Sequence, residues 1–211
     1  VLVVLHGGVL HEDVEGFEVH RQLVFVGADD VEGVIGPVGG VAQRPPHRDA
    51  DRLGKPVIGH CLGGQLMSKA MGGEITRNPV KEIGWGEVFG EADATARHWL
   101  GDFAGGSGTV FHWHGETFSI PPGASRLCSN AYCANQMFAR GPHLGMQCHV
   151  EMTPEMITSW SAHWADETTG LAKQPSIQTP EQMIGEAASR VAAMRKLSDQ
   201  LYAVWITGLA R

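Results

Sequence analysis

The segment that most constrains the fold of this chain is residues 55–65, where the short apolar run KPVI leads directly into GHCLGGQ. The run is typical of a buried strand, and the residues after the cysteine predict a helix over 62–71. A Gly-x-Cys-x-Gly turn between a strand and a helix is the thiol counterpart of the Gly-x-Ser-x-Gly nucleophile elbow. Such a turn needs glycine because it brings backbone atoms close together. Cys61 is therefore predicted to point into a crevice at the end of the strand, where the helix N-terminus favours a thiolate.

Further apolar runs and helix-start signals predict an alternation of strands and helices. The runs predict strands over 1–5, 31–35, 56–59, 110–113 and 144–150. Thr-Pro-Glu occurs at 153–155 and 179–181, and each time the threonine suits an N-cap and the proline suits the first helical position. The apolar residues after the second site keep a helical period to about residue 206. The alternation predicts one α/β domain over 1–211, with a mostly parallel sheet and helices on both faces, as in a flavodoxin-like or Rossmann-like three-layer sandwich.

Composition excludes several classes of partner. The 211 residues carry a formal net charge of −7 and contain no Lys/Arg run, which argues against a nucleic-acid partner. No stretch approaches the roughly 20 consecutive apolar residues of a membrane span, and no signal peptide is visible. Four cysteines in a chain of this length suit cytosolic thiols better than a disulfide framework. The chain is therefore predicted to act in the cytoplasm.

A second group of reactive residues lies in GMQCHVE, at 145–151. Residues two apart on a strand point to the same side, so His149 and Glu151 are predicted to project together. A thiol needs a base to become a thiolate, and an imidazole needs an acceptor that fixes its tautomer. Cys61, His149 and Glu151 would supply a nucleophile, a base and an orienting group, provided that the fold brings them together.

With these motifs, the chain resembles the class I glutamine amidotransferase family, in particular its small stand-alone members, which are similar to the amidotransferase domain of GMP synthase. The resemblance is carried by KPVIGHCLGGQLMSKAMGG (55–73), FHWHGETFSIPPGASRLCSN (111–130), CANQMF (133–138) and GMQCHVEMTPEM (145–156). It implies a cysteine-nucleophile amidohydrolase that needs no metal or cofactor. The triad of Cys61, His149 and Glu151 would release ammonia from glutamine through a γ-glutamyl thioester, and a synthetase on a partner chain would use the ammonia.

The resemblance also implies how the substrate is held. The family's oxyanion hole uses the backbone N–H after the nucleophile, here that of Leu62, and a second N–H from an upstream Gly-Gly loop. GVIGPVGG (33–40) can be matched to that loop, which makes Gly39 or Gly40 the second donor. Gln65 matches a position that lines the glutamine pocket. Two N–H donors aimed at a developing oxyanion lower the barrier by several kcal/mol.

The sequence departs from the family pattern in two places. Residues 9–54 are atypical, since few residues separate Gly40 from Cys61 and no clear amphipathic helix occurs in 9–30, which is consistent with a shortened N-terminal region. Val150 stands where the family commonly has proline between its histidine and glutamate. Valine suits a strand and leaves both flanking side chains in place.

Other interpretations stay open at this stage. The same triad could serve a γ-glutamyl peptidase or hydrolase, and the atypical N-terminal region would also suit an impaired, non-catalytic relative. His60, beside the nucleophile, is a candidate base, although adjacent residues on a sharp turn diverge and a place against the sheet fits it better. A zinc site is an alternative explanation for a group of histidines and cysteines, and the resemblance explains the same segment without a metal: His112, His114, Cys128 and Cys133.

Overall fold

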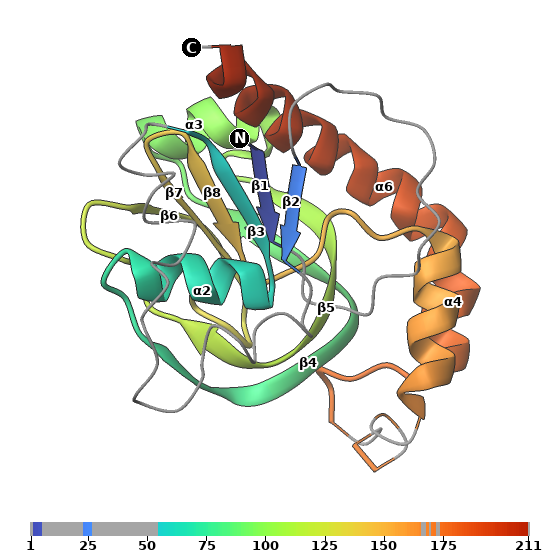
Figure 1. Ribbon diagram of the computed structural model, residues 1–211. Coiled ribbons are helices and arrows are strands. Elements are labelled where there is room, and N and C mark those ends of the chain that lie inside the picture. Colours follow the sequence, from blue (N-terminus) through green and yellow to red (C-terminus); the bar gives the residue numbers. More distant parts are fainter. Residues whose placement is uncertain are drawn as a thin grey trace.

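One mixed sheet of eight strands organises the part of the chain that the structure describes (Figure 1). The structure is a computed structural model, and it describes residues 2–5, 23–26, 55–165, 168, 170–171 and 174–210. The strands are β1 (Leu2–Leu5), β2 (Leu23–Val26), β3 (Val57–His60), β4 (Ile75–Gly90), β5 (Ser107–Phe118), β6 (Ser125–Ser129), β7 (Met137–Arg140) and β8 (His143–Met146), and their order in the sheet is β2-β1-β3-β8-β7-β6-β4-β5. The strand predicted over 31–35 lies outside the described residues. Because 6–22 and 27–54 also lie outside them, the single domain over 1–211 stays a prediction.

Four α-helices accompany the sheet within these ranges. They are α2 (Leu62–Ala70), α3 (Ala94–Leu100), α4 (Pro154–His163) and α6 (Pro180–Thr207), and two short 3-10 turns occur at Gly101–Phe103 and Gly208–Ala210. Thr153 and Thr179 cap α4 and α6 by accepting the backbone N–H of the third helical residue, as the Thr-Pro-Glu sequences predict. None of the helices in the described ranges combines the length and the apolar character that crossing a membrane requires.

The α/β fold with helices on both faces is confirmed, but the mostly parallel sheet is wrong. Strands β2, β1, β3 and β8 pair in parallel, whereas every pairing from β8 through β7, β6 and β4 to β5 is antiparallel. Between β5 and β8 the chain holds two further strands, β6 and β7, rather than a helix that crosses over the sheet. Only a two-residue turn joins β7 to β8, and a parallel pairing needs a connection of a dozen or more residues.

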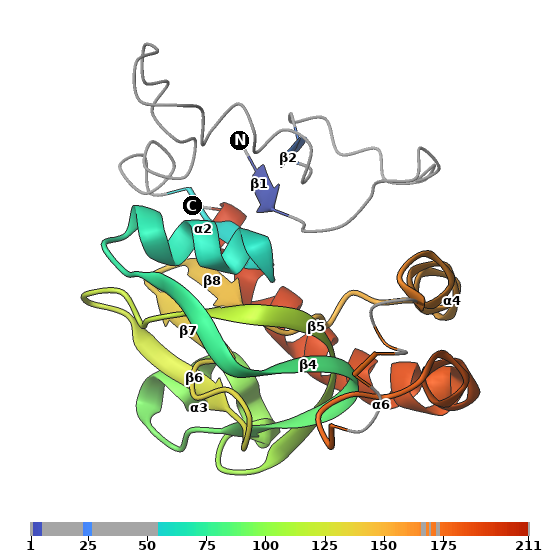
Figure 2. The same ribbon diagram turned by 90° about the horizontal axis from the view of Figure 1, so that it is seen from below.

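Side chains alternate between two cores, one on each face of the sheet. Val57 and Phe138 pack under α2 with Met67 and Phe118, while the next residues along their strands face a larger core that α3 and α6 cover. Figures 1 and 2 show α2 on one side of the sheet and α3 and α6 on the other. The order β2-β1-β3 reverses at β1, which is the topological switch point of a flavodoxin-like sheet. Ligands bind such sheets beyond the carboxyl ends of the strands at this point, which is where β3 ends.

Candidate active site

The elbow after β3 has the strained geometry that its sequence predicts. Cys61 has φ 48° and ψ −108° and is the one non-glycine residue with positive φ in the described ranges. A Cβ on Gly59 would lie 2.6 Å from the carbonyl carbon of Gly63, and a Cβ on Gly64 would lie 2.3 Å from the carbonyl oxygen of Met146. Both contacts are with backbone that has no room to move, so glycine is required at both positions. The turn therefore presents Cys61 at the N-terminus of α2.

Cys61 differs from the other cysteines in its exposure and its polar contacts. It is partly exposed, whereas the remaining three are buried. The side-chain amide of Gln147 donates to the Cys61 Sγ at 3.5 Å, and the Sγ lies 3.7 Å from the carbonyl oxygen of Trp113. Burial raises the pKa of the Cys128 thiol to about 12 and that of Cys148 well above its usual range, so these thiols stay protonated. Among the four cysteines, Cys61 therefore has the surroundings that suit a nucleophile.

His149 joins Cys61 to Glu151. Its Nδ1–H donates to Glu151 Oε1 at 2.6 Å, and the other carboxylate oxygen accepts the Val150 backbone N–H at 2.8 Å. Burial alone would lower the pKa of His149, but the charge of Glu151 and hydrogen bonds with Cys61 and Glu151 outweigh it and raise this pKa to about 10. The arrangement favours a protonated His149 at neutral pH, next to the Glu151 carboxylate and the Cys61 side chain.

The strand predicted over 144–150 is wrong beyond β8, although the pairing of His149 with Glu151 is present. Strand β8 ends at Met146, and residues 147–151 are bends with one isolated antiparallel bridge between Phe111 and His149. The two residues of that bridge exchange N–H···O bonds of 2.8 and 3.0 Å. The imidazole also meets the face of Trp160 edge-on at a centroid distance of 5.1 Å. The bridge and the tryptophan hold His149, and the carboxylate folds back toward it.

Two of the residues predicted to hold the substrate, Leu62 and Gln65, lie in the described part of the chain. Leu62 is the first residue of α2, whose N-terminal N–H groups lack partners within the helix. Gln65 is buried, and its side-chain amide donates to Gln147 Oε1 at 3.1 Å, so the two glutamines form a chain that ends at Cys61. Gly39 and Gly40 lie outside the described residues. The sequence interpretation missed Gln147, although its position two residues before His149 was a usable signal.

The contacts of His60 favour a place beside the carboxylate of Glu151 over a role as the base next to the nucleophile. Its Nε2 lies 3.4 Å from Glu151 Oε2 and 3.0 Å from the hydroxyl of Tyr202 on α6. The sequence interpretation placed His60 against the sheet and assigned no role to Tyr202. A contact between residues 142 positions apart leaves no local signal in the sequence.

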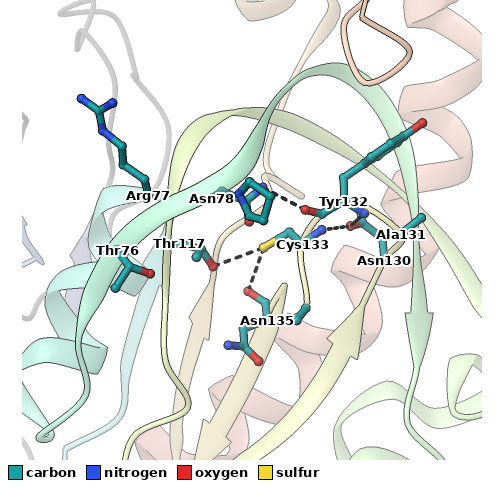
Figure 3. A pocket seen from close by; sticks show the side chains of 11 residues that line it. Thr76, Arg77, Asn78, Thr117, Asn130, Ala131, Tyr132, Cys133 and Asn135 are labelled. Carbon is teal, nitrogen blue, oxygen red and sulfur yellow. Dashed lines mark hydrogen bonds between the residues drawn. The ribbon is translucent and has the colours of Figure 1, made fainter.

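A pocket of about 370 Å³ opens away from these residues, between the start of β4 and the loop that joins β6 to β7 (Figure 3). Cys133 lies at its wall, where its thiol contacts Thr117 Oγ1 at 3.2 Å and the Asn135 carbonyl oxygen at 3.6 Å. Among the residues that the structure describes, no predicted catalytic or substrate-binding residue lines this pocket. We therefore place the candidate active site at Cys61 and not in this pocket.

Comparison with known proteins matches this geometry to a family. The family model described as Glutamine amidotransferase class-I matches residues 38–159, more than half of the chain. The chain belongs to this family. The matched range includes both Cys61 and the His149–Glu151 pair.

Several relatives of this class-I amidotransferase chain are known. A putative glutamine amidotransferase-like protein, YfeJ of Salmonella typhimurium, is 35% identical over 53% of this chain and 46% of its own length. GMP synthase [glutamine-hydrolyzing] of Bordetella avium is 31% identical over 48% of this chain and 20% of its own length. The chain thus spans less than half the length of these curated relatives. The crystal structure of a glutamine amidotransferase from Methylobacillus flagellatus is 30% identical and has a TM-score of 0.79, with 100% of this chain and 95% of that chain covered.

A buried carboxylate, Glu82 on β4, organises a second polar cluster in this amidotransferase. Each carboxylate oxygen accepts an amide N–H, from Asn130 at 2.5 Å and from Gln136 at 2.8 Å, and His114 Nε2 lies 3.0 Å from Oε2. Burial alone would raise the pKa of Glu82, but the hydrogen bond with His114 and the attraction of His112 and His114 lower it. The cluster ties β4 and β5 to the loop before β7.

The same cluster contains the donor types of a metal site. Ligand atoms of Glu82, His112 and His114 lie within 4.8 Å of one another, and two imidazoles with one carboxylate can bind a divalent ion such as zinc. Burial lowers the pKa of His112 to about 4 despite the opposing charge of Glu82, so its ring is neutral at pH 7. The group differs from the zinc alternative drawn from the sequence, because Cys128 and Cys133 are not part of it. Hydrogen bonds to the Glu82 oxygens already compensate its charge.

Replacing Glu82 with glutamine is expected to destabilise the protein by about 3 kcal/mol in chemical unfolding, because an NH2 group then faces the amide donors of Asn130 or Gln136. Glu87→Gln is the matched control on the exposed side of β4, and it should change the free energy of unfolding by less than about 0.5 kcal/mol. The pKa of Glu82 is lowered from 4.5, so its contribution is complete above pH 4.5 and is lost as the pH falls through the lower folded-state pKa. The difference between wild type and Glu82→Gln should therefore shrink in acid. Equal stability at pH 7 would contradict the role of Glu82.

Proposed function

We propose that this chain hydrolyses the side-chain amide of glutamine, with Cys61 as nucleophile, His149 as general base and acid, and Glu151 as the group that orients His149. The observation that carries the proposal is that one buried imidazole bonds the Glu151 carboxylate at 2.6 Å and interacts with the Cys61 thiol on the elbow, and both interactions raise its pKa. Membership of the class-I amidotransferase family makes glutamine the first substrate to consider. The partial exposure of Cys61 supports access from outside.

The chemistry follows from this arrangement. The Cys61 thiolate attacks the side-chain carbonyl carbon of glutamine and forms a tetrahedral oxyanion. When the C–N bond breaks, the His149 imidazolium gives its proton to the leaving nitrogen, which departs as ammonia and leaves a γ-glutamyl thioester. His149 then takes a proton from water as the water attacks the thioester, and glutamate leaves as the C–S bond breaks. Glu151 keeps the proton on Nδ1, so Nε2 faces the thiol and the substrate throughout.

The substrate would be held by groups around the elbow. We assign the Leu62 backbone N–H at the start of α2 to the oxyanion, and Gly39 or Gly40 stays the predicted source of the second N–H. Gln65 and Gln147 bond each other beside Cys61, and the pair offers amide groups to the amide of a bound glutamine. The Gln147 N–H that donates to the Cys61 sulfur would also stabilise a thiolate there.

We infer that the ammonia serves a synthetase. Relatives named GMP synthase [glutamine-hydrolyzing] support a coupling between glutamine hydrolysis and synthesis. The coupling partner is proposed to be a synthetase on another chain, which supplies the acceptor.

Release of glutamate and ammonia from free glutamine, measured beside release of glutamate from γ-glutamyl peptides, tests the substrate. We expect turnover of free glutamine to exceed that of the peptides. In parallel, intact-mass analysis after incubation with a glutamine-mimicking electrophile should show one adduct that maps to Cys61. A higher rate on γ-glutamyl peptides would favour the peptidase alternative instead. Absence of both an adduct and turnover would favour an impaired relative.

A further inference from the structure

We infer that His60 and Tyr202 are positioning residues of the active site: His60 holds the Glu151 carboxylate against His149, and Tyr202 holds the His60 ring. The inference rests on the proposed function, since it extends the group of Cys61, His149 and Glu151. It adds two residues beyond that group, one next to the nucleophile in the sequence and one from the C-terminal helix α6.

The contacts around Glu151 support this role. One carboxylate oxygen accepts from His149 at 2.6 Å. The other accepts the Val150 N–H at 2.8 Å and lies 3.4 Å from His60 Nε2. The carboxylate is thus bonded to the catalytic imidazole on one side and faces a second imidazole on the other. Only 13% of the Glu151 side chain is exposed, so protein groups rather than water set its orientation.

Charge identifies which nitrogen of His60 carries a proton. A lone pair on Nε2 would face the negative oxygen of Glu151 at 3.4 Å, which is repulsive, so the proton belongs on Nε2. The Tyr202 oxygen, 3.0 Å from the same nitrogen, shares this N–H. Burial first, and then the charge of Glu151, raise the pKa of Tyr202 well above its usual range. Its hydroxyl therefore stays neutral and keeps the His60 ring in place.

The backbone explains why His60 can do this while Cys61 serves the substrate. His60 is the last residue of β3, and its side chain is 3% exposed. The positive φ of Cys61 turns the chain sharply, so the two adjacent side chains point to different places. The ring of Tyr202 stands edge-on to that of His60 at a centroid distance of 6.2 Å. Through Tyr202, α6 therefore packs against His60 and its contact with Glu151.

The pH dependence follows from the groups that face each residue. His149 is faced by Glu151, by Cys61 on the elbow and by His112 on β5. Of these, Glu151 is the one that His60 contacts, and Tyr202 in turn bonds His60. If the carboxylate loses its support, it stabilises the imidazolium less, and the proton leaves His149 at lower pH. The alkaline limb of the kcat/KM profile should move accordingly.

His60→Leu, His60→Gln and Tyr202→Phe test the inference. We expect His60→Leu to lower kcat for glutamine about 10-fold, to leave KM within about 2-fold, and to move the alkaline limb down by about one pH unit. His60→Gln should recover most of kcat and the limb, because its amide N–H can reach the same carboxylate. Tyr202→Phe should lower kcat and move the alkaline limb down, each by about a third of the change seen in His60→Leu. The matched control is His143→Leu on the adjacent strand β8, which removes a buried imidazole bonded to the Val57 N–H.

The outcomes separate the inference from the proposed function. An unchanged alkaline limb in His60→Leu, with a loss of thermal stability equal to that of His143→Leu, would mean a purely structural role and would overturn the inference. The same holds if His60→Gln behaves like His60→Leu. If wild type forms no adduct on Cys61, the proposed function itself is wrong. If wild type forms the adduct at a normal rate, and His60→Leu keeps a normal kcat and a normal alkaline limb, the positioning role is wrong while the proposed function stands.

Discussion

Cys61→Ala is expected to abolish glutamine turnover, by at least about 10⁴-fold, and to abolish covalent labelling by a glutamine-mimicking electrophile. The physical reason is that the thioester needs the sulfur, and the three other cysteines are buried with pKa values raised above that of a free thiol. Glutamate release and intact mass measure the two effects. Full glutaminase activity in Cys61→Ala would remove the basis of the proposed function.

A second substitution at the same position separates chemistry from folding. Cys61 and an alanine in its place both keep a Cβ at φ 48°, a conformation that costs L-residues about 1 to 3 kcal/mol. Cys61→Gly relieves this strain and loses part of the gain because glycine is more flexible in the unfolded chain. We expect Cys61→Gly to be inactive and about 1 kcal/mol more stable than Cys61→Ala in chemical unfolding. A less stable glycine variant would contradict a strained elbow.

His149→Ala is expected to lower kcat/KM for glutamine by about 10³-fold, because the substitution removes both proton transfers. The labelling rate should fall as well, since the thiolate loses its partner. The pKa of His149 is raised to about 10, so the imidazolium persists at neutral pH and is lost as the pH rises through that value. Wild-type kcat/KM should therefore decline near pH 10, and this limb should be absent from the residual activity of His149→Ala.

The stability of the protein should follow the same titration. The folded-state pKa of His149 lies above its ordinary value of 6.5, so the protonated imidazole stabilises the fold fully below that pH. This contribution is lost as the pH rises toward 10. Unfolding midpoints of wild type and His149→Ala, compared at pH 6 and at alkaline pH, should converge as the pH rises. A constant difference between the two proteins would indicate that the imidazole is neutral throughout.

The elbow could be predicted from sequence because its determinants are local. A short apolar strand, two glycines and a helix start all lie within 55–65, and the structure shows the same order of elements. The pairing of His149 with Glu151 was predicted on the assumption of an extended strand, which is wrong for these residues. Strand alternation is absent at 147–151, and the contact arises because the carboxylate folds back to the imidazole.

The antiparallel half of the sheet could not be predicted from the sequence, for a different reason. Strand β4 contains glycine, proline and charged residues in ITRNPVKEIGWGEVFG, so it lacks the apolar run that marked β3. Its stability comes from pairing with β5 along most of its length. Likewise, β6 and β7 are short, and their partners decide their state. His60, Tyr202 and Glu82 acquire their roles through contacts between distant segments, which no local pattern reports.

The distances along the chain between the members of the active site have a kinetic consequence. The Gln147 amide bonds the Cys61 sulfur across 86 residues, and His60 meets Tyr202 across 142. Closing such loops is entropically costly, and folds rich in non-local contacts fold slowly. A refolding chain would therefore recover helical signal well before it recovers a reactive thiol. The rate at which the electrophile begins to label Cys61 would then report the last step of folding, in which α6 packs against the elbow.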